Sequence, residues 1–512
     1  MALAAGALAY AAALLCAALA AAYLYFTRHF RHWAAKGVPH ERPLPFVGNF
    51  KDVVLMRTSM GLLAKEVYER RKREPFVGLF AFDQPVLQIH DLALARAVLV
   101  KDFHAFTDRS CSANARVDPL PVRSLFALTG DHWKRSRAAL TPSFTSGKMK
   151  RMYQLVTQCG QLLLDTISNE GYADKPVVAY ELTSRYTMDS IASCAFGIQG
   201  NTLADPDAAF RRTLLQHFEF SPRRALVMAT AWFAPALIDL LGLKLTKQEV
   251  EDFVRGTIVT TIRQREKDQA KRNDLLDSLI QLKQAGSIED DEDRGEQMAN
   301  KLVLEEEDVC AHSFAFLMDG FETTASTLNY MLFELARNDA VQDKLRKEIQ
   351  DAIIDGSISY ETLHGLKYLD MVMQETLRKY PPLPFISRTS TSKYTLPGTN
   401  VTLEKGSRII LPMYGFHMDP EFHRNPKIFD PDRFSEENKR NIPNYSFMPF
   451  SEGPRNCIGM RFAHMQTKSA VAHLLSKYSV HPCSSTPEEI IFNPKTFLLQ
   501  PKYGIELILR RL

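Results

Sequence analysis

The sequence has little cysteine, and its cysteines follow no ordered spacing. Seven occur in 512 residues, an odd number, and no two are spaced as Cys-x-x-Cys. This distribution argues against a disulfide framework and a typical zinc site, and it favours a reducing compartment. The net charge of +4 is too small to indicate nucleic-acid binding by itself.

The sequence also lacks linkers, repeats and a dinucleotide-binding motif. No Gly/Ser-rich or Pro-rich linker divides it, although 512 residues could form one large domain or several. There is no Gly-x-Gly-x-x-Gly motif and no flavin domain, so redox chemistry would need electrons from a partner protein. Hydrophobic residues make up 45% of the chain, which is normal for a globular protein with a full core.

A long uncharged segment opens the chain. Ala2–Phe26 has no charged residue and exceeds the roughly 20 residues that span a bilayer as a helix. Arg28, Arg31 and Lys36 follow, so the positive-inside rule places the body in the cytosol and the N-terminus in the lumen. A cleaved signal peptide is the alternative, because Ala-x-Ala sites occur. We predict an anchor, since the run is long for a signal peptide and its charges follow it.

A stiff segment comes next. Pro39, Pro43 and Pro45 disfavour a helix, so this stretch is expected to be a spacer that sets the body against the membrane. We predict three parts: a transmembrane anchor at 1–26, a basic and Pro-rich hinge at 27–50, and one catalytic domain at 51–512.

The body is predicted to be mainly α-helical with small β-sheets. Phe76–Phe82 and Pro85–His90 carry β-rich alternating patterns and predict a hairpin. Helical patterns dominate from Leu92 onward, and one long helix is expected from Glu305 to Asn338.

One cysteine near the C-terminus lies in a distinctive loop, FSEGPRNCIG, from Phe450 to Gly459. Gly453 can take a positive φ, and the proline after it stiffens the turn. Cys457 is then expected at a helix N-terminus, where backbone N–H groups, the helix dipole and the nearby Arg455 stabilise a thiolate. A lone cysteine is usually a small buried hydrophobe, but this setting favours a thiolate that ligates a soft metal such as haem iron.

Two helical motifs precede this loop. Trp133 and Arg137 lie one turn apart on one helix face, which in isolation indicates only a surface aromatic–cation pair. The run Asp319-Gly320-Phe321-Glu322-Thr323 places a glycine inside the long helix, where it costs stability unless a kink or a close ligand approach requires it. A threonine there can simply bond back to its own helix.

Three short motifs complete the set. Glu375 and Arg378 form Glu-x-x-Arg, which alone is common on helix surfaces. Arg388 closes a Pro-Pro-x-Pro…Arg segment, and Arg433 lies in Pro-x-Arg-Phe. None of these three is specific without the others.

In this order the motifs resemble the cytochrome P-450 family over nearly the whole body. The cysteine loop matches the haem-binding signature F-x-x-G-x-R-x-C-x-G without a mismatch. The other runs resemble the family's W-x-x-x-R, its small-Gly-x-acid-Thr helix, its E-x-x-R, its P-P-x-P…R and its P-x-R-F. The residues within these motifs are similar to those of microsomal, membrane-anchored members of the family, including insect members that act in detoxification.

The resemblance implies a role for each residue. Haem b would be held by Phe450, Arg455, Cys457 and Gly459, with Cys457 as the axial iron ligand. Its propionates would be bound by Trp133, Arg137, Arg388 and Arg455. The helix over its oxygen side would carry Asp319, Gly320 and the proton-relaying pair Glu322 and Thr323. A buried ionic network of Glu375, Arg378 and Arg433 would hold the cysteine loop.

The implied fold is one large haem-binding domain with an N-terminal transmembrane helix. The implied reaction is monooxygenation, in which one oxygen atom of O2 enters a lipophilic xenobiotic or an endogenous lipid or hormone. Electrons would come from NADPH–cytochrome P-450 reductase, with cytochrome b5 as an optional second donor, at the endoplasmic reticulum membrane. A haem-thiolate isomerase or dehydratase and a non-enzymatic haem sensor or carrier are the alternatives. The Glu322–Thr323 pair argues against the isomerase.

Asp319 departs from the family pattern, which usually has alanine or glycine there. Asp319 and Thr323 are four residues apart, so both are expected on the haem side of the helix. Three outcomes are open: a neutral or hydrogen-bonded acid that shapes the pocket, an ester to a haem methyl group, or a helix turned so that Asp319 avoids the haem.

Overall fold

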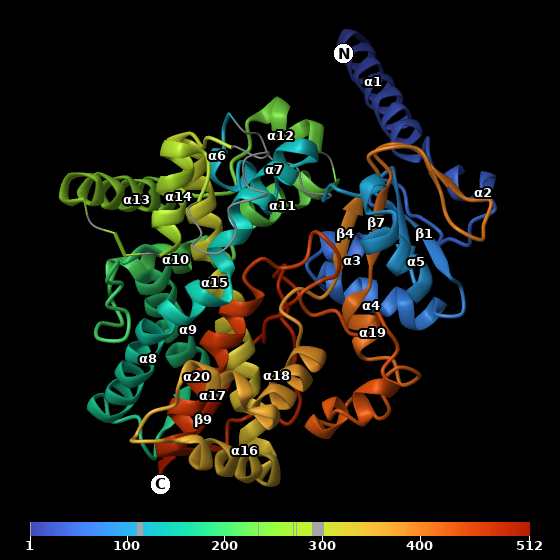
Figure 1. Cartoon of the computed structure of the whole chain (residues 1–512). Helices are drawn as coiled ribbons and strands as arrows, with labels where there is room; N and C mark the ends of the chain where they lie inside the picture. Colours follow the sequence, from blue (N-terminus) through green and yellow to red (C-terminus); the bar gives the residue numbers. More distant parts are fainter. Residues whose placement is uncertain (1, 110–115, 234, 270, 273, 289–301) are drawn as a thin grey trace. The chain divides into compact units, whose positions relative to one another are not determined.

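The structure is a computed structural model, which describes all residues except 1, 110–115, 234, 270, 273 and 289–301 (Figure 1). Its contacts divide the chain into two compact units, Met1–Ser110 with Phe385–Gly415 and Cys111–Pro384 with Phe416–Leu512. Helices predominate in the described chain, and its strands form three small sheets. The predicted class, mainly α with small β-sheets, is confirmed.

The first unit is built on a four-stranded sheet with the order β1-β2-β7-β4. β1 (Phe76–Ala81) and β2 (Gln84–Ile89) form the predicted hairpin. β7 (Arg408–Leu411) pairs parallel with β2, and β4 (Ile386–Thr389) pairs antiparallel with β7. The unit also contains the two-stranded ribbon β5 (Tyr394–Thr395) and β6 (Thr402–Leu403), and the helices α1 (Ala2–Thr27), α2 (His32–Ala35), α3 (Lys51–Val54), α4 (Met60–Arg71), α5 (Leu92–Arg96), η1 (Ala97–Lys101) and η2 (Phe103–Ala105).

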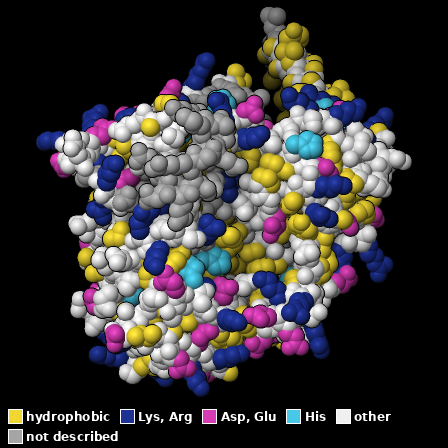
Figure 2. Space-filling view, viewed as in Figure 1, with side chains coloured by type: hydrophobic (Ala, Val, Ile, Leu, Met, Phe, Trp, Pro, Cys, Tyr) yellow, Lys and Arg dark blue, Asp and Glu magenta, His cyan; other side chains and the backbone are white. Residues whose placement is uncertain are grey.

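Helix α1 is exposed and apolar. Among the described residues it is the one helix long and apolar enough to cross a membrane, over Ala4–Thr27. Figure 2 shows its hydrophobic side chains, with Lys and Arg side chains gathered at its base. Arg28 pairs with Asp83 of the β1–β2 turn at 2.9 Å. Trp33 is buried and donates from Nε1 to the carbonyl of Leu79 at 2.9 Å. The start of the predicted hinge is therefore packed against the hairpin.

A glycine makes this packing possible. A Cβ at Gly78 would lie 2.4 Å from the Trp33 ring, a distance that real Cβ atoms do not show. The tryptophan ring therefore lies directly on the backbone of β1.

The second unit is a helical body, in which α8, α9, α15 and α20 pack together (Figure 1). A three-stranded sheet, β3-β9-β8, completes it. Its helices are α6 (Pro119–Val122), α7 (Gly130–Leu140), η3 (Thr141–Phe144), α8 (Ser146–Asn169), α9 (Ala179–Ile191), η4 (Ala192–Phe196), α10 (Ala209–Phe218), α11 (Pro222–Phe233), α12 (Pro235–Leu241), α13 (Gln248–Asp268), α14 (Leu275–Ala285), α15 (Glu306–Arg337), α16 (Asp339–Ala352), α17 (Tyr360–Gly365), α18 (Lys367–Lys379), η6 (Pro431–Phe434), η7 (Asn438–Asn441) and α20 (Met460–Lys477). Its strands are β3 (Pro176–Val178), β8 (Tyr478–Pro482) and β9 (Glu506–Arg511), and α19 (Met413–His417) runs across the boundary between the units.

The long helix appears as predicted. α15 begins with a capping box, in which Glu305 and Asp308 each accept from the other's backbone N–H. Acidic residues in its first turn and Arg337 in its last turn also suit the helix dipole.

The segment Phe218–Leu241 contains the two helices α11 and α12. Pro222 and Pro235 are the first residues of α11 and α12, a position where the missing N–H costs nothing. Val227, Ala231 and Ile238 pack in a small core, while Leu226 and Leu240 are exposed. The segment is thus partly ordinary core and partly exposed apolar surface.

Candidate functional site

The cysteine loop is tightly turned and ends at a helix. Ser451 and Gly453 have φ values of +60° and +75°. The N–H of Cys457 donates to the carbonyl of Phe450 at 2.9 Å, which closes the loop. α20 begins at Met460, and the Cys457 thiol is exposed. A thiol that is accessible and near a helix N-terminus is in the setting that stabilises a thiolate.

Two arginines border this thiol. Arg137 of α7 donates to the backbone and side-chain oxygens of Asn456, at 2.8 and 2.7 Å. Arg455 is buried, donates to the carbonyl of Leu128, and lies 4.7 Å above the Trp133 ring. Burial lowers the pKa of Arg137, and negative charge on Cys457 opposes that shift. Trp133 and Arg137 are therefore packed on the cysteine loop rather than forming an isolated surface pair.

One stripe of α15, the uncovered stripe, is less buried than the residues on either side of it. From Val309 to Ala336 every residue of this helix is buried except Phe316, Asp319, Gly320 and Thr323. Their spacing of three, one and three residues places them on one helix face. Asp319 and Thr323 share this face, as expected from their separation.

Gly320 has a tight protein neighbour. A Cβ there would lie 3.1 Å from Cδ1 of Ile191, at the end of α9. The helix pair α9–α15 therefore supplies a packing reason for this glycine, alongside the predicted approach of a ligand.

Glu322 points away from the uncovered stripe. Its side chain is wholly buried and accepts from Tyr180 Oη and Gln500 Nε2, each at 2.5 Å, and from Ser326 Oγ at 3.3 Å. Burial raises the pKa of Glu322, and these three donors oppose that shift. Nothing in the sequence pattern pointed to Tyr180 or Gln500, which come from distant parts of the chain.

Thr323 bonds back to its own helix. Its hydroxyl donates to the carbonyl of Asp319 at 2.6 Å. The oxygen keeps its capacity to accept, because a hydroxyl has one donor and two lone pairs. Glu322 and Thr323 are neighbours in sequence, yet their side chains bond to different partners.

The predicted ionic network assembles in the core of the second unit. Arg378 binds Glu375 through Nε and Nη2 at 2.7 and 2.8 Å, and both side chains are fully buried. Nε of Arg433 lies 3.4 Å from the same carboxylate. The N–H of Asp430 also donates to Glu375, at 3.0 Å. This pair is not a helix-surface pair, because both of its side chains lie on the buried face of α18.

Arg388 belongs to the first unit, on β4. It is buried, and its Nη1 donates to the carbonyl of Ser387 at 2.8 Å. The remaining predicted site residues lie in the second unit.

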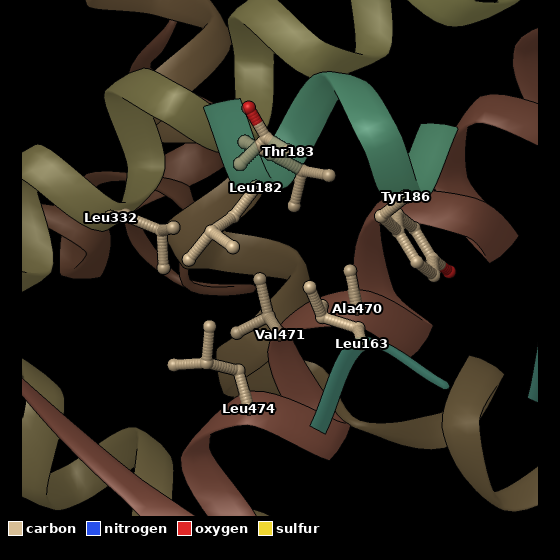
Figure 3. A pocket seen from close by; sticks show the side chains of 9 residues that line it. Leu163, Leu182, Thr183, Tyr186, Leu332, Ala470, Val471 and Leu474 are labelled. Carbon is tan, nitrogen blue, oxygen red and sulfur yellow. The ribbon is translucent and has the colours of Figure 1, made fainter. Parts of the chain in front are cut away.

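A small cavity lies elsewhere in the core. Its lining comes from α8, α9, α15 and α20 (Figure 3): Leu163, Leu182, Thr183, Tyr186, Leu328, Leu332, Ala470, Val471 and Leu474. None of these is a predicted site residue. Because the lining is almost wholly aliphatic, the cavity is better described as imperfect packing than as a reactive site.

The residues around Cys457 fit a haem. Within the described ranges, histidine, cysteine, aspartate and glutamate side chains do not group in threes as a bare metal site would require. One exposed thiol suits a haem iron, whose other ligands come largely from the porphyrin. Apart from its neighbours in sequence, no described residue lies within 4 Å of a Cβ placed on Gly459, so a flat group could lie against that backbone.

The chain belongs to the cytochrome P450 family and is a cytochrome P450 monooxygenase, since the family model for cytochrome P450 matches residues 38–508. It is 42% identical to cytochrome P450 6j1 of Blattella germanica, over 95% of this chain and 94% of that protein. It is 39% identical to cytochrome P450 6k1 of the same insect, over 96% and 94%. Probable cytochrome P450 6a14 of Drosophila melanogaster is 35% identical, over 96% and 98%.

Proposed function

We propose that this monooxygenase is membrane-anchored and acts on lipophilic small molecules, with electrons delivered from NADPH by a reductase. The observation that carries the proposal is that the second unit contains both an exposed Cys457 thiol and the four-residue uncovered stripe within the otherwise buried middle of α15. The exposed apolar helix α1 supports attachment to a membrane. We propose the endoplasmic reticulum membrane, with the body on the cytosolic side, because basic residues follow that helix.

Cys457 would hold haem b through its thiolate, with Phe450 and Gly459 beside the ring. Bound haem supplies the activation of O2, and its thiolate ligand favours O–O cleavage. Arg137 and Arg455 would pair with the propionates, because a buried carboxylate without a partner is costly. Trp133 orients Arg455 through its ring face. Arg388 of β4 is proposed for the same role.

The distal proton would pass through Thr323 and Glu322. Thr323 lies on the uncovered stripe, so its hydroxyl could hold a proton on the side of α15 that is proposed to face the haem. Burial raises the pKa of Glu322, which favours the protonated form that a proton donor needs. To serve Thr323 it must leave the hydrogen bonds from Tyr180 and Gln500. In this structure, these two hydrogen bonds therefore hold the Glu322 carboxyl away from Thr323.

Thr323→Ala should uncouple electron use from product formation. The hydroxyl that manages the proton is lost while electron entry is untouched, so NADPH consumption should continue as hydrogen peroxide rises. General acid–base groups contribute about 10²–10⁴-fold to rate, so a fall of roughly tenfold or more in product per NADPH is expected. Thr327→Ala is the matched control, because its hydroxyl also bonds back, to the carbonyl of Thr323 at 2.9 Å, but its side chain is buried, one turn beyond the stripe. Equal coupling in both variants would contradict the assignment.

We propose that Asp319 shapes the pocket as a hydrogen-bonded acid. Acid–organic extraction of enzyme after turnover should move all of the haem, with unmodified mass, into the organic phase. Haem retained on the protein would instead support an ester. Asp319→Ala should change substrate affinity, regioselectivity or spin state, and no change in any of the three would contradict a role in the pocket.

The decisive assay for the function combines the chain with NADPH, reductase and O2. Substrate-dependent NADPH consumption with one oxygen atom from labelled O2 in the product is expected. Turnover without NADPH would instead support an isomerase or dehydratase, and haem binding without turnover would support a sensor.

The substrate class is proposed as lipophilic xenobiotics. Phe316 on the uncovered stripe supports an apolar, aromatic site. A panel of lipophilic compounds, including plant toxins, insecticides and endogenous hormones, should be screened for substrate-induced Soret shifts. Shifts confined to hormones or lipids would contradict the xenobiotic proposal.

Deleting Met1–Phe26 should move most of the protein from the membrane pellet to the supernatant. About 20 apolar residues suffice for a transmembrane helix, so this segment is expected to be the main anchor. Ultracentrifugation of membranes from expressing cells measures the distribution. Residual pelleting that disappears with Leu226→Glu and Leu240→Glu would identify the exposed side of α11 and α12 as a second contact. An N-terminus found removed from the mature protein would instead support a signal peptide.

A further inference from the structure

His417 lies between the ionic network and the cysteine loop. It is the last residue of α19 and is fully buried. Its Nε2 lies 3.0 Å from the backbone N of Met448, and its Nδ1 lies 3.2 Å from the carbonyl of Arg378. An N–H group can only meet a lone pair, so Nε2 accepts and Nδ1 carries the proton that is donated to Arg378. The ring is therefore neutral, in keeping with burial, which holds the pKa of His417 well below its usual value.

On one side, His417 is tied to the buried pair. Nη1 of Arg378 donates to the carbonyl of His417 at 2.9 Å, so the two residues bond to each other in both directions. Arg378 is in turn fixed by Glu375. The position of the His417 ring therefore follows the position of the pair.

On the other side, His417 is tied to the start of the cysteine loop. The carbonyl of Met448 accepts from the N–H of Ser451 at 2.9 Å. The carbonyl of Phe450, between them, accepts from the N–H of Cys457 at 2.9 Å. Hydrogen bonds and short backbone segments thus connect Glu375, Arg378 and His417 to Cys457.

We propose that His417 is a positioning residue, which transmits the rigidity of the Glu375–Arg378 pair to the cysteine loop through the N–H of Met448. The inference rests on the proposed ligation of haem iron by Cys457. Within the described chain, the Arg378 guanidinium donates to Glu375, His417, Met418 and Pro426, whereas His417 contacts both Arg378 and the Met448 backbone. Loss of the acceptor at Nε2 should free the loop without removing the pair itself.

Three substitutions separate the two hydrogen bonds of the ring. His417→Gln keeps an acceptor near the ε position for Met448, His417→Asn keeps a donor near the δ position for Arg378, and His417→Leu keeps neither. The first readout is the fraction of the reduced carbonyl complex with the long-wavelength Soret band of thiolate ligation. We expect the Gln variant to retain most of that band, and the Asn and Leu variants to lose at least half of it.

The second readout is hydrogen exchange at the Met448 amide in the holoenzyme. Its protection should fall by about tenfold in the Asn and Leu variants, as expected for loss of one hydrogen bond, and stay near the wild-type value with Gln. If the Leu variant does not fold, the comparison of Asn with Gln still decides.

His423→Leu is the matched control. His423 is also buried, six residues further on, but its Nε2 only approaches the carbonyl of Ser446, at 3.5 Å. Its loss should lower the unfolding temperature and leave the band unchanged. Equal loss of the band in His423→Leu and His417→Leu, or equal behaviour of the Gln and Asn variants, would overturn the proposal. A wild-type enzyme without the band would overturn ligation by Cys457 instead.

Discussion

Replacing Cys457 with alanine should abolish thiolate ligation, and the reduced carbonyl complex should lose its long-wavelength Soret band completely. Burial raises the pKa of Cys159 to about 12 and that of Cys310 to about 11, so these thiols stay protonated. Burial also raises the pKa of Cys194. No other thiol in this group could take over as a thiolate.

Cys483→Ala is the control for this result. Burial alone would raise the pKa of the partly exposed Cys483 thiol, but hydrogen bonds with Ser485 and Thr486 outweigh burial and lower this pKa. Among the described cysteines outside the loop, it is therefore the one whose thiolate form is favoured by its surroundings. Its removal should leave the band intact, and a band that survived Cys457→Ala but not Cys483→Ala would reverse the assignment.

Replacing Arg378 with methionine should destabilise the protein severely. The variant leaves the Glu375 carboxylate buried with only weaker partners, and breaking a buried ion pair in this way typically costs about 3–5 kcal/mol. Denaturant unfolding should show this loss, together with a fall in haem content. The exposed pair of Lys367, at the start of the same helix, with Glu436 provides the control, since the two side chains are 78% and 81% exposed. Lys367→Met should cost less than about 1 kcal/mol.

A double variant separates stability from positioning. Glu375→Leu with Arg378→Met removes both charges, and such replacements are often close to neutral for stability. We expect it to recover much of the unfolding free energy lost by Arg378→Met but little of the long-wavelength band. Recovery of both would show that the pair serves stability alone.

The sequence by itself determined the family, the fold class and the local character of the main elements. The cysteine loop was readable because Gly453, the adjacent proline and the following helix act over a few residues. The helix α15 could be predicted because its apolar repeat and its capping residues lie within the segment itself. The hairpin β1–β2 followed from alternation and a short turn. The cytochrome P450 match confirms what these motifs indicated together.

Only the tertiary structure decided what each helix face meets. Periodicity placed Asp319 and Thr323 on one side of α15, but it could not show that Glu322 accepts from Tyr180 and Gln500. It also could not show that Ile191 lies where a side chain of residue 320 would be.

The same limit applies to the cysteine loop. The partner of Arg137 proved to be Asn456, and His417 linked Arg378 to Met448. These partners are up to several hundred positions apart in the chain. The physical reason is that a repeat of 3.6 residues sets only the direction of a side chain about its own axis. Its neighbours are set by how distant helices pack, and the packing depends on the shapes of all the side chains at once.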